Sequence, residues 1–120
     1  MKSLKRAIVT TTLGLICLNV DLALAATRIK FAPGSYCGSY SGNFVRGRDF
    51  VLGLRRGQTL TTRNIGGGTQ YNLDVSGPTG SIRGRQEGED QINYPIPATG
   101  DYYISVVAST DFSNIEFCAY

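Results

Sequence analysis

The sequence predicts a small all-β protein, a jelly-roll-like antiparallel β-sandwich of about eight strands with one disulfide. Short segments with alternating apolar and polar residues follow one another, turns rich in glycine and proline separate them, and no segment after Ala25 shows a sustained helical period. Many short strands at regular spacing are typical of sandwiches and barrels. The expected strands are Arg28–Ala32, Tyr36–Phe44, Asp49–Arg55, Gln58–Arg63, Gln70–Ser76, Gln91–Ile96, Asp101–Ala108 and Phe112–Tyr120.

Turn-forming residues separate these strands. Pro33-Gly34 follows the first strand, Arg56-Gly57 the third, and Gly66-Gly67-Gly68 the fourth. Proline presets its φ angle and glycine tolerates positive φ, so both favour tight reversals of the chain. Longer turns are expected at Gly77-Pro78-Thr79-Gly80 and Pro97-Ala98-Thr99-Gly100. No helix follows the triple glycine, so we interpret it as a loop and not as a phosphate cradle.

Alternation along each strand assigns one face to the core. In the last strand, Cys118 is in phase with Glu116, and Cys37 is in phase with Ser39 and Ser41. Both cysteines are therefore expected on the more polar, outer faces of their strands. The predicted core residues are Phe50, Leu52, Leu54, Tyr71, Leu73, Val75, Ile92, Tyr94, Ile96, Tyr102, Ile104 and Val106. In the last strand Ile115, Phe117 and Ala119 share the phase opposite to that of Cys118.

The first 25 residues are typical of a secretory signal peptide. Basic residues precede an apolar run from Ala7 to Val20, and Ala23-Leu24-Ala25 ends the segment with small residues at the cleavage positions. Cleavage after Ala25 would leave residues 26–120 as one domain in the periplasm or outside the cell. The apolar run is shorter than the roughly 20 residues needed to span a bilayer, so no stable membrane insertion is expected. The alternatives are a retained anchor and a lipid attached at Cys17.

Export also changes the interpretation of the cysteines and the charge. Cys37 and Cys118 would be the only cysteines left, and an even number in an exported domain favours a disulfide. They lack the close spacing of a redox-active pair, so we expect the bridge to stabilise the fold. The signal peptide removes three of the 12 basic residues and one of the nine acidic residues. The remaining charge of about +1 argues against nucleic-acid binding.

The composition disfavours an enzyme. The sequence has no histidine, which removes histidine-dependent triads and the commonest zinc ligand sets. Glu87, Glu89 and Asp90 form the tightest acidic group, but they lack the ligand order of a calcium loop. We therefore expect no catalytic residue, metal or cofactor, and interpret the acidic group as a solvated loop.

Arginine is the most informative polar residue. Two segments read Arg-Gly-Arg, at residues 46–48 and 83–85, and Arg55, Arg56 and Arg63 lie between them. Glycine between arginines favours exposed turns that present guanidinium groups to carboxylates of a partner. The alternative is that these arginines solvate the surface and pair loosely with Glu87, Glu89 and Asp90.

The order of several motifs resembles a known family. These are Phe31-Ala32-Pro33-Gly34, Tyr40-Ser41-Gly42, Gly57-Gln58-x-Leu60, Gly77-Pro78-x-Gly80 and the segment from Pro97 to Val106. Together they are similar to the small β-sandwich proteins that inhibit g-type and i-type lysozymes in the bacterial periplasm. The same elements also resemble the pre-peptidase C-terminal domains of secreted peptidases. Most of the shared residues are turn and core positions, which specify a fold more than a function.

The resemblance implies a non-enzymatic protein whose protruding loop enters the acidic cleft of a lysozyme. Carried over to this sequence, the binding residues are Tyr40, Ser41, Arg46 and Arg48, with Ser41 supplying a hydroxyl and the arginines meeting carboxylates. The connection before the last strand, residues 108–114, differs from that family because it contains no basic residue. The alternative function is an accessory module that binds polysaccharide or an envelope protein, with exposed tyrosines such as Tyr36, Tyr40, Tyr103 and Tyr120 stacking on sugars. The sequence does not determine the oligomeric state.

Overall fold

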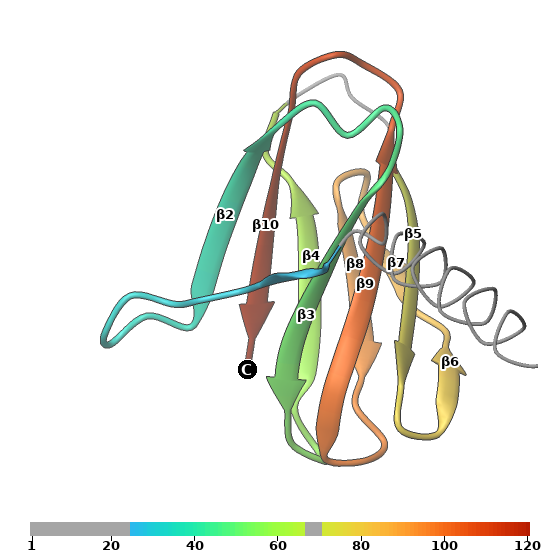
Figure 1. Cartoon of the computed structure of the whole chain (residues 1–120). Coiled ribbons are helices and arrows are strands. Elements are labelled where there is room, and N and C mark those ends of the chain that lie inside the picture. The colour runs from blue at the N-terminus through green and yellow to red at the C-terminus, as the bar shows by residue number, and fades with distance from the viewer. Residues whose placement is uncertain (1–24, 67–70) are drawn as a thin grey trace, which may run out of the picture.

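The computed structural model describes residues 25–66 and 71–120, which form two facing β-sheets (Figure 1). The predicted all-β sandwich is confirmed, with ten short strands among the described residues where eight were expected. Within the described residues, no helix is long and apolar enough to cross a membrane. The strands are β1 (Thr27–Arg28), β2 (Cys37–Gly42), β3 (Arg48–Leu54), β4 (Thr59–Asn64), β5 (Tyr71–Gly77), β6 (Gly80–Ile82), β7 (Arg85–Glu87), β8 (Gln91–Pro95), β9 (Gly100–Ala108) and β10 (Ser113–Ala119).

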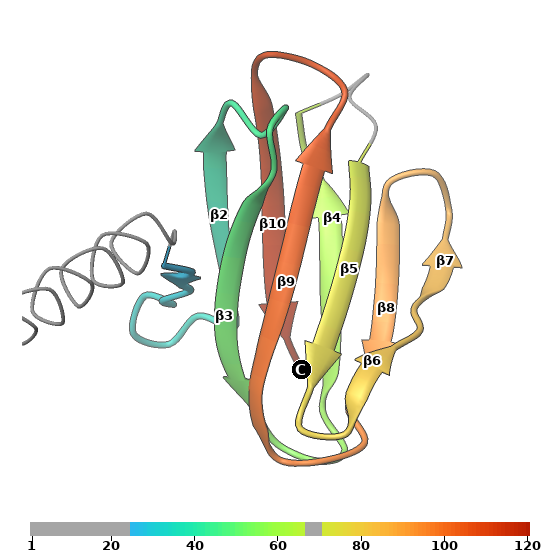
Figure 2. The ribbon, with the colours of Figure 1, turned by 45° about the vertical axis from the view of Figure 1, so that its right-hand side comes forward.

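Each sheet contains five strands. The first has the order β1-β3-β9-β5-β6, and the second has the order β2-β10-β4-β8-β7. Neighbouring strands are antiparallel except at one edge, where the two-residue β1 runs parallel to β3. In Figure 2 the sheet that contains β3, β9 and β5 lies in front of the sheet that contains β10 and β4. The chain repeatedly crosses between the layers, so loops from different parts of the sequence meet at the two ends of the sandwich.

The expected strands differ from the observed ones mainly at residues 80–87. Two three-residue strands, β6 and β7, lie where turns and an Arg-Gly-Arg segment were predicted. The chain passes between the sheets at Gly84, where a Cβ would overlap the side chains of Ile92 and Tyr94. The expected strand at residues 28–32 was also too long, because only Thr27 and Arg28 pair with β3. The predicted signal peptide, apart from Ala25, and residues Gly67, Gly68 and Gln70 lie outside the described residues.

The core lies between the sheets and matches the predicted phases. All predicted core residues are buried except three, Tyr71, Leu73 and Ile92, which pack partly buried against the others. Phe44 and Leu60 were not predicted, yet both are fully buried. Phe44 closes the core beside the β2–β3 connection, where its carbonyl accepts hydrogen bonds from the backbone of Gly47 and Ala108.

The predicted disulfide between Cys37 and Cys118 is present. The two residues lie directly opposite each other on β2 and β10, and 81 positions separate them in the sequence. Cross-linking a loop of this length disfavours the unfolded chain by roughly 4 to 5 kcal/mol in the chain-entropy treatment. The expected outward position is only partly correct, because Cys118 is buried. The bridge therefore fastens the edge strand β2 to its sheet.

Candidate functional site

Three connections gather at one end of the sandwich, uppermost in Figures 1 and 2. We call this the loop end, and it comprises residues 43–47 between β2 and β3, residues 65–66 after β4, and residues 109–112 between β9 and β10. Of the four predicted binding residues, Arg46 lies within the loop end, Ser41 lies near the end of β2, and Arg48 begins β3. The topology thus brings these three to the same end, whereas the Tyr40 side chain packs partly buried against the core.

Arg46 is presented by a tight turn. Asn43 Oδ1 accepts a hydrogen bond of 3.0 Å from the Val45 backbone, and Phe44 O accepts one of 2.9 Å from Gly47 N. Gly47 has φ of 90°, a conformation that favours glycine. Arg46 is exposed and forms no ion pair with any described residue. Its guanidinium is therefore available to a carboxylate of another molecule.

Arg48 has a different environment, although one glycine separates it from Arg46. It shares its phase with Phe50, and its guanidinium carbon lies 5.3 Å from the Phe50 ring centroid and 5.7 Å from that of Phe44. Its Nη2 also lies 3.5 Å from Thr27 Oγ1. Such cation–π contacts hold the half-buried cation over the edge of the core. The expectation that both arginines of this pair extend from an exposed turn is correct only for Arg46.

Tyr40 and Ser41 lie on opposite faces of β2. The Tyr40 ring centroid is 5.1 Å from that of Phe50 and 6.2 Å from that of Phe117. Its hydroxyl accepts a hydrogen bond of 3.1 Å from Lys30 N, so the expectation of an exposed Tyr40 is wrong. Ser41 is exposed and pairs with Asn114 across the ladder. Tyr36, Tyr103 and Tyr120 are exposed, as expected.

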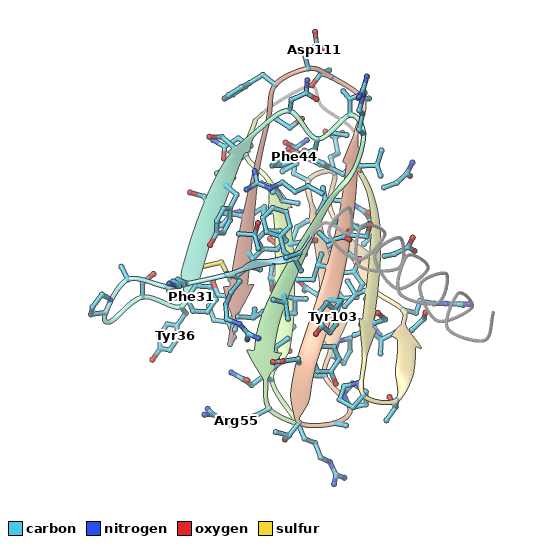
Figure 3. All side chains as sticks on the ribbon, in the orientation of Figure 1. Phe31, Tyr36, Phe44, Arg55, Tyr103 and Asp111 are labelled. Carbon is cyan, nitrogen blue, oxygen red and sulfur yellow. A yellow bond between two sulfur atoms is a disulfide. The ribbon has the colours of Figure 1, made fainter. Side chains whose placement is uncertain are left out.

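The loop end also carries apolar side chains that the sequence analysis did not identify. Phe112 is 67% exposed, Val45 43% and Ile65 42%, and each comes from a different connection. The backbone near Phe112 is held by a 2.9 Å hydrogen bond from Thr110 Oγ1 to Phe112 O. Exposed apolar side chains on loops at one end of a fold are candidates for an interaction surface. The signal in the sequence was an aromatic residue in an otherwise polar segment, residues 109–114. In Figure 3 the neighbouring Asp111 marks the tip of this connection.

The remaining arginines do not gather with Arg46. Arg55 and Arg56 lie in the β3–β4 turn at the opposite end, and Arg83 and Arg85 lie beside β6 and β7. The described residues form two ion pairs, Arg28 with Asp101 at 3.2 Å and Arg63 with Glu116 at 2.7 Å. The expected loose pairing with Glu87, Glu89 and Asp90 is therefore absent among the described residues.

Two groups of described residues were candidates for chemistry, a possible metal-ligand cluster and the lining of a cleft. Among the described residues, Cys37, Glu116 and Cys118 are the one group close enough to hold a metal ion, but both sulfurs form the disulfide. A cleft of about 180 Å³ is lined by Tyr71, Glu89 and Asp90, among others. Burial raises the pKa of Tyr71, and its hydroxyl donates a 2.9 Å hydrogen bond to Asn114 O. A tyrosine that is held neutral in this way is a poor nucleophile.

The fold is similar to that of periplasmic inhibitors of g-type lysozyme. The inhibitor PliG from Aeromonas hydrophila matches with a TM-score of 0.61 and 21% identity, over 80% of this chain and 96% of that chain. PliG from Salmonella Typhimurium matches with a TM-score of 0.62 and 16% identity, over 82% of this chain and 100% of that chain. No family model and no curated protein matches the sequence.

A second group of sandwiches has the same architecture. The pre-peptidase C-terminal domain of a Bacillus anthracis collagenase matches with a TM-score of 0.57 and 12% identity, over 82% of this chain and 97% of that chain. Both resemblances predicted from the motifs are thus confirmed for the fold. At these identities the likeness establishes the architecture alone.

Proposed function

We propose that this protein is an exported, non-enzymatic inhibitor that places its loop end in the cleft of a lysozyme, with g-type lysozyme as the first candidate. The proposal depends most on one observation, that an unpaired arginine, Arg46, and the exposed side chains of Val45 and Phe112 lie at the same end of an inhibitor-like sandwich. The similarity to periplasmic inhibitors of g-type lysozyme supports it.

The chemistry of the loop end suits an acidic enzyme cleft. Glycoside hydrolases typically act through carboxyl groups that flank the scissile bond. A guanidinium carries a permanent charge and can form two parallel hydrogen bonds to one carboxylate. Arg46 is free to make this contact, and the Ser41 hydroxyl on neighbouring β2 would add a polar contact at the margin. Occupation of the cleft would then exclude the polysaccharide substrate.

Phe112 would supply most of the apolar contact. Its side chain is 67% exposed in the free protein, and complete burial of a phenylalanine is worth about 1.5–3 kcal/mol. Aromatic residues and arginine are both enriched at the centres of protein interfaces. This arrangement also offers a substitute for the missing basic residues between β9 and β10, because the β2–β3 turn supplies the cation instead.

Inhibition assays with purified lysozymes test the proposal. We expect the protein to reduce lysis by g-type lysozyme at micromolar concentration, and Phe112→Ala or Arg46→Ala to raise the inhibition constant about tenfold or more. Tyr103→Ala and Arg83→Ala are matched controls, because they remove an exposed aromatic and an exposed arginine away from the loop end. Full lysis by g-type, i-type and c-type enzymes in the presence of excess protein would reject the proposal. Equal losses in the controls would reject the assigned surface.

A further inference from the structure

An aromatic cleft lies toward the opposite end of the sandwich, distant from the loop end. It has a volume of about 700 Å³ and is lined by Phe31, Tyr36, Arg55, Gln58, Thr99 and Asp101, among others. These residues come from the β1–β2 connection, the β3–β4 turn and the start of β9. Figure 3 shows Phe31 and Tyr36 together on one side, with Arg55 below them. The cleft is shallow and open to solvent, so it suits a ligand that lies across the surface.

The aromatic wall of the cleft is held in place by the fold. Phe31 packs partly buried against the core, whereas Tyr36 is 67% exposed. The Tyr36 ring centroid lies 6.4 Å from that of the exposed Tyr120. Tyr36 O accepts a 2.9 Å hydrogen bond from Ala119 N, and the disulfide of Cys37 fastens the next residue. An exposed ring on such a restrained backbone loses little conformational freedom when a ligand stacks on it.

The polar wall is also ordered by contacts within the protein. Gln58 Oε1 accepts a 2.6 Å hydrogen bond from Arg55 N, which leaves the amide NH₂ group as a donor. Thr99 Oγ1 accepts a 3.0 Å hydrogen bond from Arg56 N, which leaves the hydroxyl proton as another. Fixed donors beside exposed aromatic rings suit a ligand that has both hydroxyl groups and an apolar C–H face. Saccharides have this combination.

The charge of the cleft indicates which class of saccharide it would favour. Arg28 neutralises the carboxylate of Asp101, because its guanidinium donates two hydrogen bonds to it and Arg28 Nη2 lies 3.2 Å from Asp101 Oδ2. Arg55 forms no ion pair with any described residue, so its charge is uncompensated. An excess positive charge at a cleft wall favours an anionic ligand. We propose that this cleft binds a saccharide that carries a carboxylate, in a site separate from the loop end and independent of lysozyme inhibition.

A titration followed by ¹⁵N NMR tests the site, with protein purified after export so that its disulfide is formed. The probe is a disaccharide of two N-acetylhexosamines, one of which bears a lactyl carboxylate, and the comparison ligand is the neutral disaccharide without that group. We expect the acidic probe to shift the backbone amides of Tyr36, Gln58 and Gly100, and to bind several times more tightly than the neutral one. The amides of residues 43–47 should not move.

Variants identify the groups responsible. Tyr36→Ala is expected to weaken binding of the acidic probe about tenfold, because it removes the stacking ring. Tyr36→Phe should retain most of the affinity, and Tyr103→Ala should retain all of it, because Tyr103 is 52% exposed outside this cleft. Arg55→Gln should abolish the preference for the acidic probe. An unchanged spectrum with the acidic probe at millimolar concentration, equal binding of the two disaccharides by the unmodified protein, or undiminished binding by Tyr36→Ala would each overturn the proposal.

Discussion

A comparison of Arg48→Ala with Arg46→Ala distinguishes an arginine that stabilises the fold from one that is free to contact a partner. The Arg48 guanidinium carbon lies 5.3 Å and 5.7 Å from the centroids of Phe50 and Phe44, which are both fully buried. A cation–π contact is worth about 0.5–1 kcal/mol when exposed and about 2 kcal/mol when desolvated. For a half-buried cation over two rings, we expect Arg48→Ala to lower the free energy of unfolding by about 1–2 kcal/mol. Arg46→Ala should change it by less than about 0.5 kcal/mol.

Urea unfolding followed by circular dichroism measures both free energies. The midpoint should fall for Arg48→Ala with little change in the urea dependence, because the core stays otherwise intact. A thermal scan should show a decrease of about 4–8 °C in melting temperature for each kcal/mol lost. In the lysozyme assay, at a temperature where both variants are folded, Arg46→Ala should cause a larger loss of inhibition than Arg48→Ala. Equal stability of the two variants would refute the structural role of Arg48.

The remaining predictions concern the disulfide, one glycine and the buried tyrosines. The double change Cys37→Ser and Cys118→Ser should cost about 4 to 5 kcal/mol in the free energy of unfolding, and an unchanged urea midpoint would contradict the stabilising role of the bridge. Gly77→Ala should lower the free energy of unfolding by about 1–3 kcal/mol or more, because its Cβ would overlap the Tyr102 ring. Gly53→Ala is a nearly neutral control, because its Cβ would make an ordinary 3.5 Å contact with Asp101 Oδ1. Similar urea midpoints for the two variants would exclude the overlap. Burial raises the pKa of Tyr94 and of Tyr71 above the ordinary value of 10.0, so the unfolded chain releases these protons first and stability should decline as the pH rises above about 10. Tyr94→Phe should flatten that decline in urea titrations at increasing pH, and an unaltered slope would contradict the assignment.

The fold could be predicted because its evidence is local in the sequence. Alternation along β3 and β9 assigns Phe50 and Ile104 to the core, and the turn residues divide the chain into strands of the correct order. The pairing of Cys37 with Cys118 could be predicted once export, and with it the loss of Cys17, was expected from the sequence. The two short strands at residues 80–87 were missed because three residues are too few to show an alternating pattern, and pairing with neighbouring strands stabilises them instead.

The candidate site could be predicted only in part, because the sequence shows the phase of a strand but not which connections lie at the same end of the fold. The phase of β3 already placed Arg48 on the same face as Phe50, so its inward position could have been inferred from the sequence. Phe112 and Val45, by contrast, lie at the same end only because the topology brings the β9–β10 and β2–β3 connections there. The cleft between Tyr36 and Arg55 also depends on tertiary structure, since it joins segments that are distant in the sequence.

Mapping a lysozyme on this protein by NMR would decide whether the loop end is the binding surface. We predict that g-type lysozyme, added to ¹⁵N-labelled protein, shifts or broadens the amide signals of residues 43–47 and 109–113 and leaves those of Gln58 and Gly100 unchanged. Signals that remain unaltered throughout, or changes confined to residues around the aromatic cleft, would contradict the proposed function.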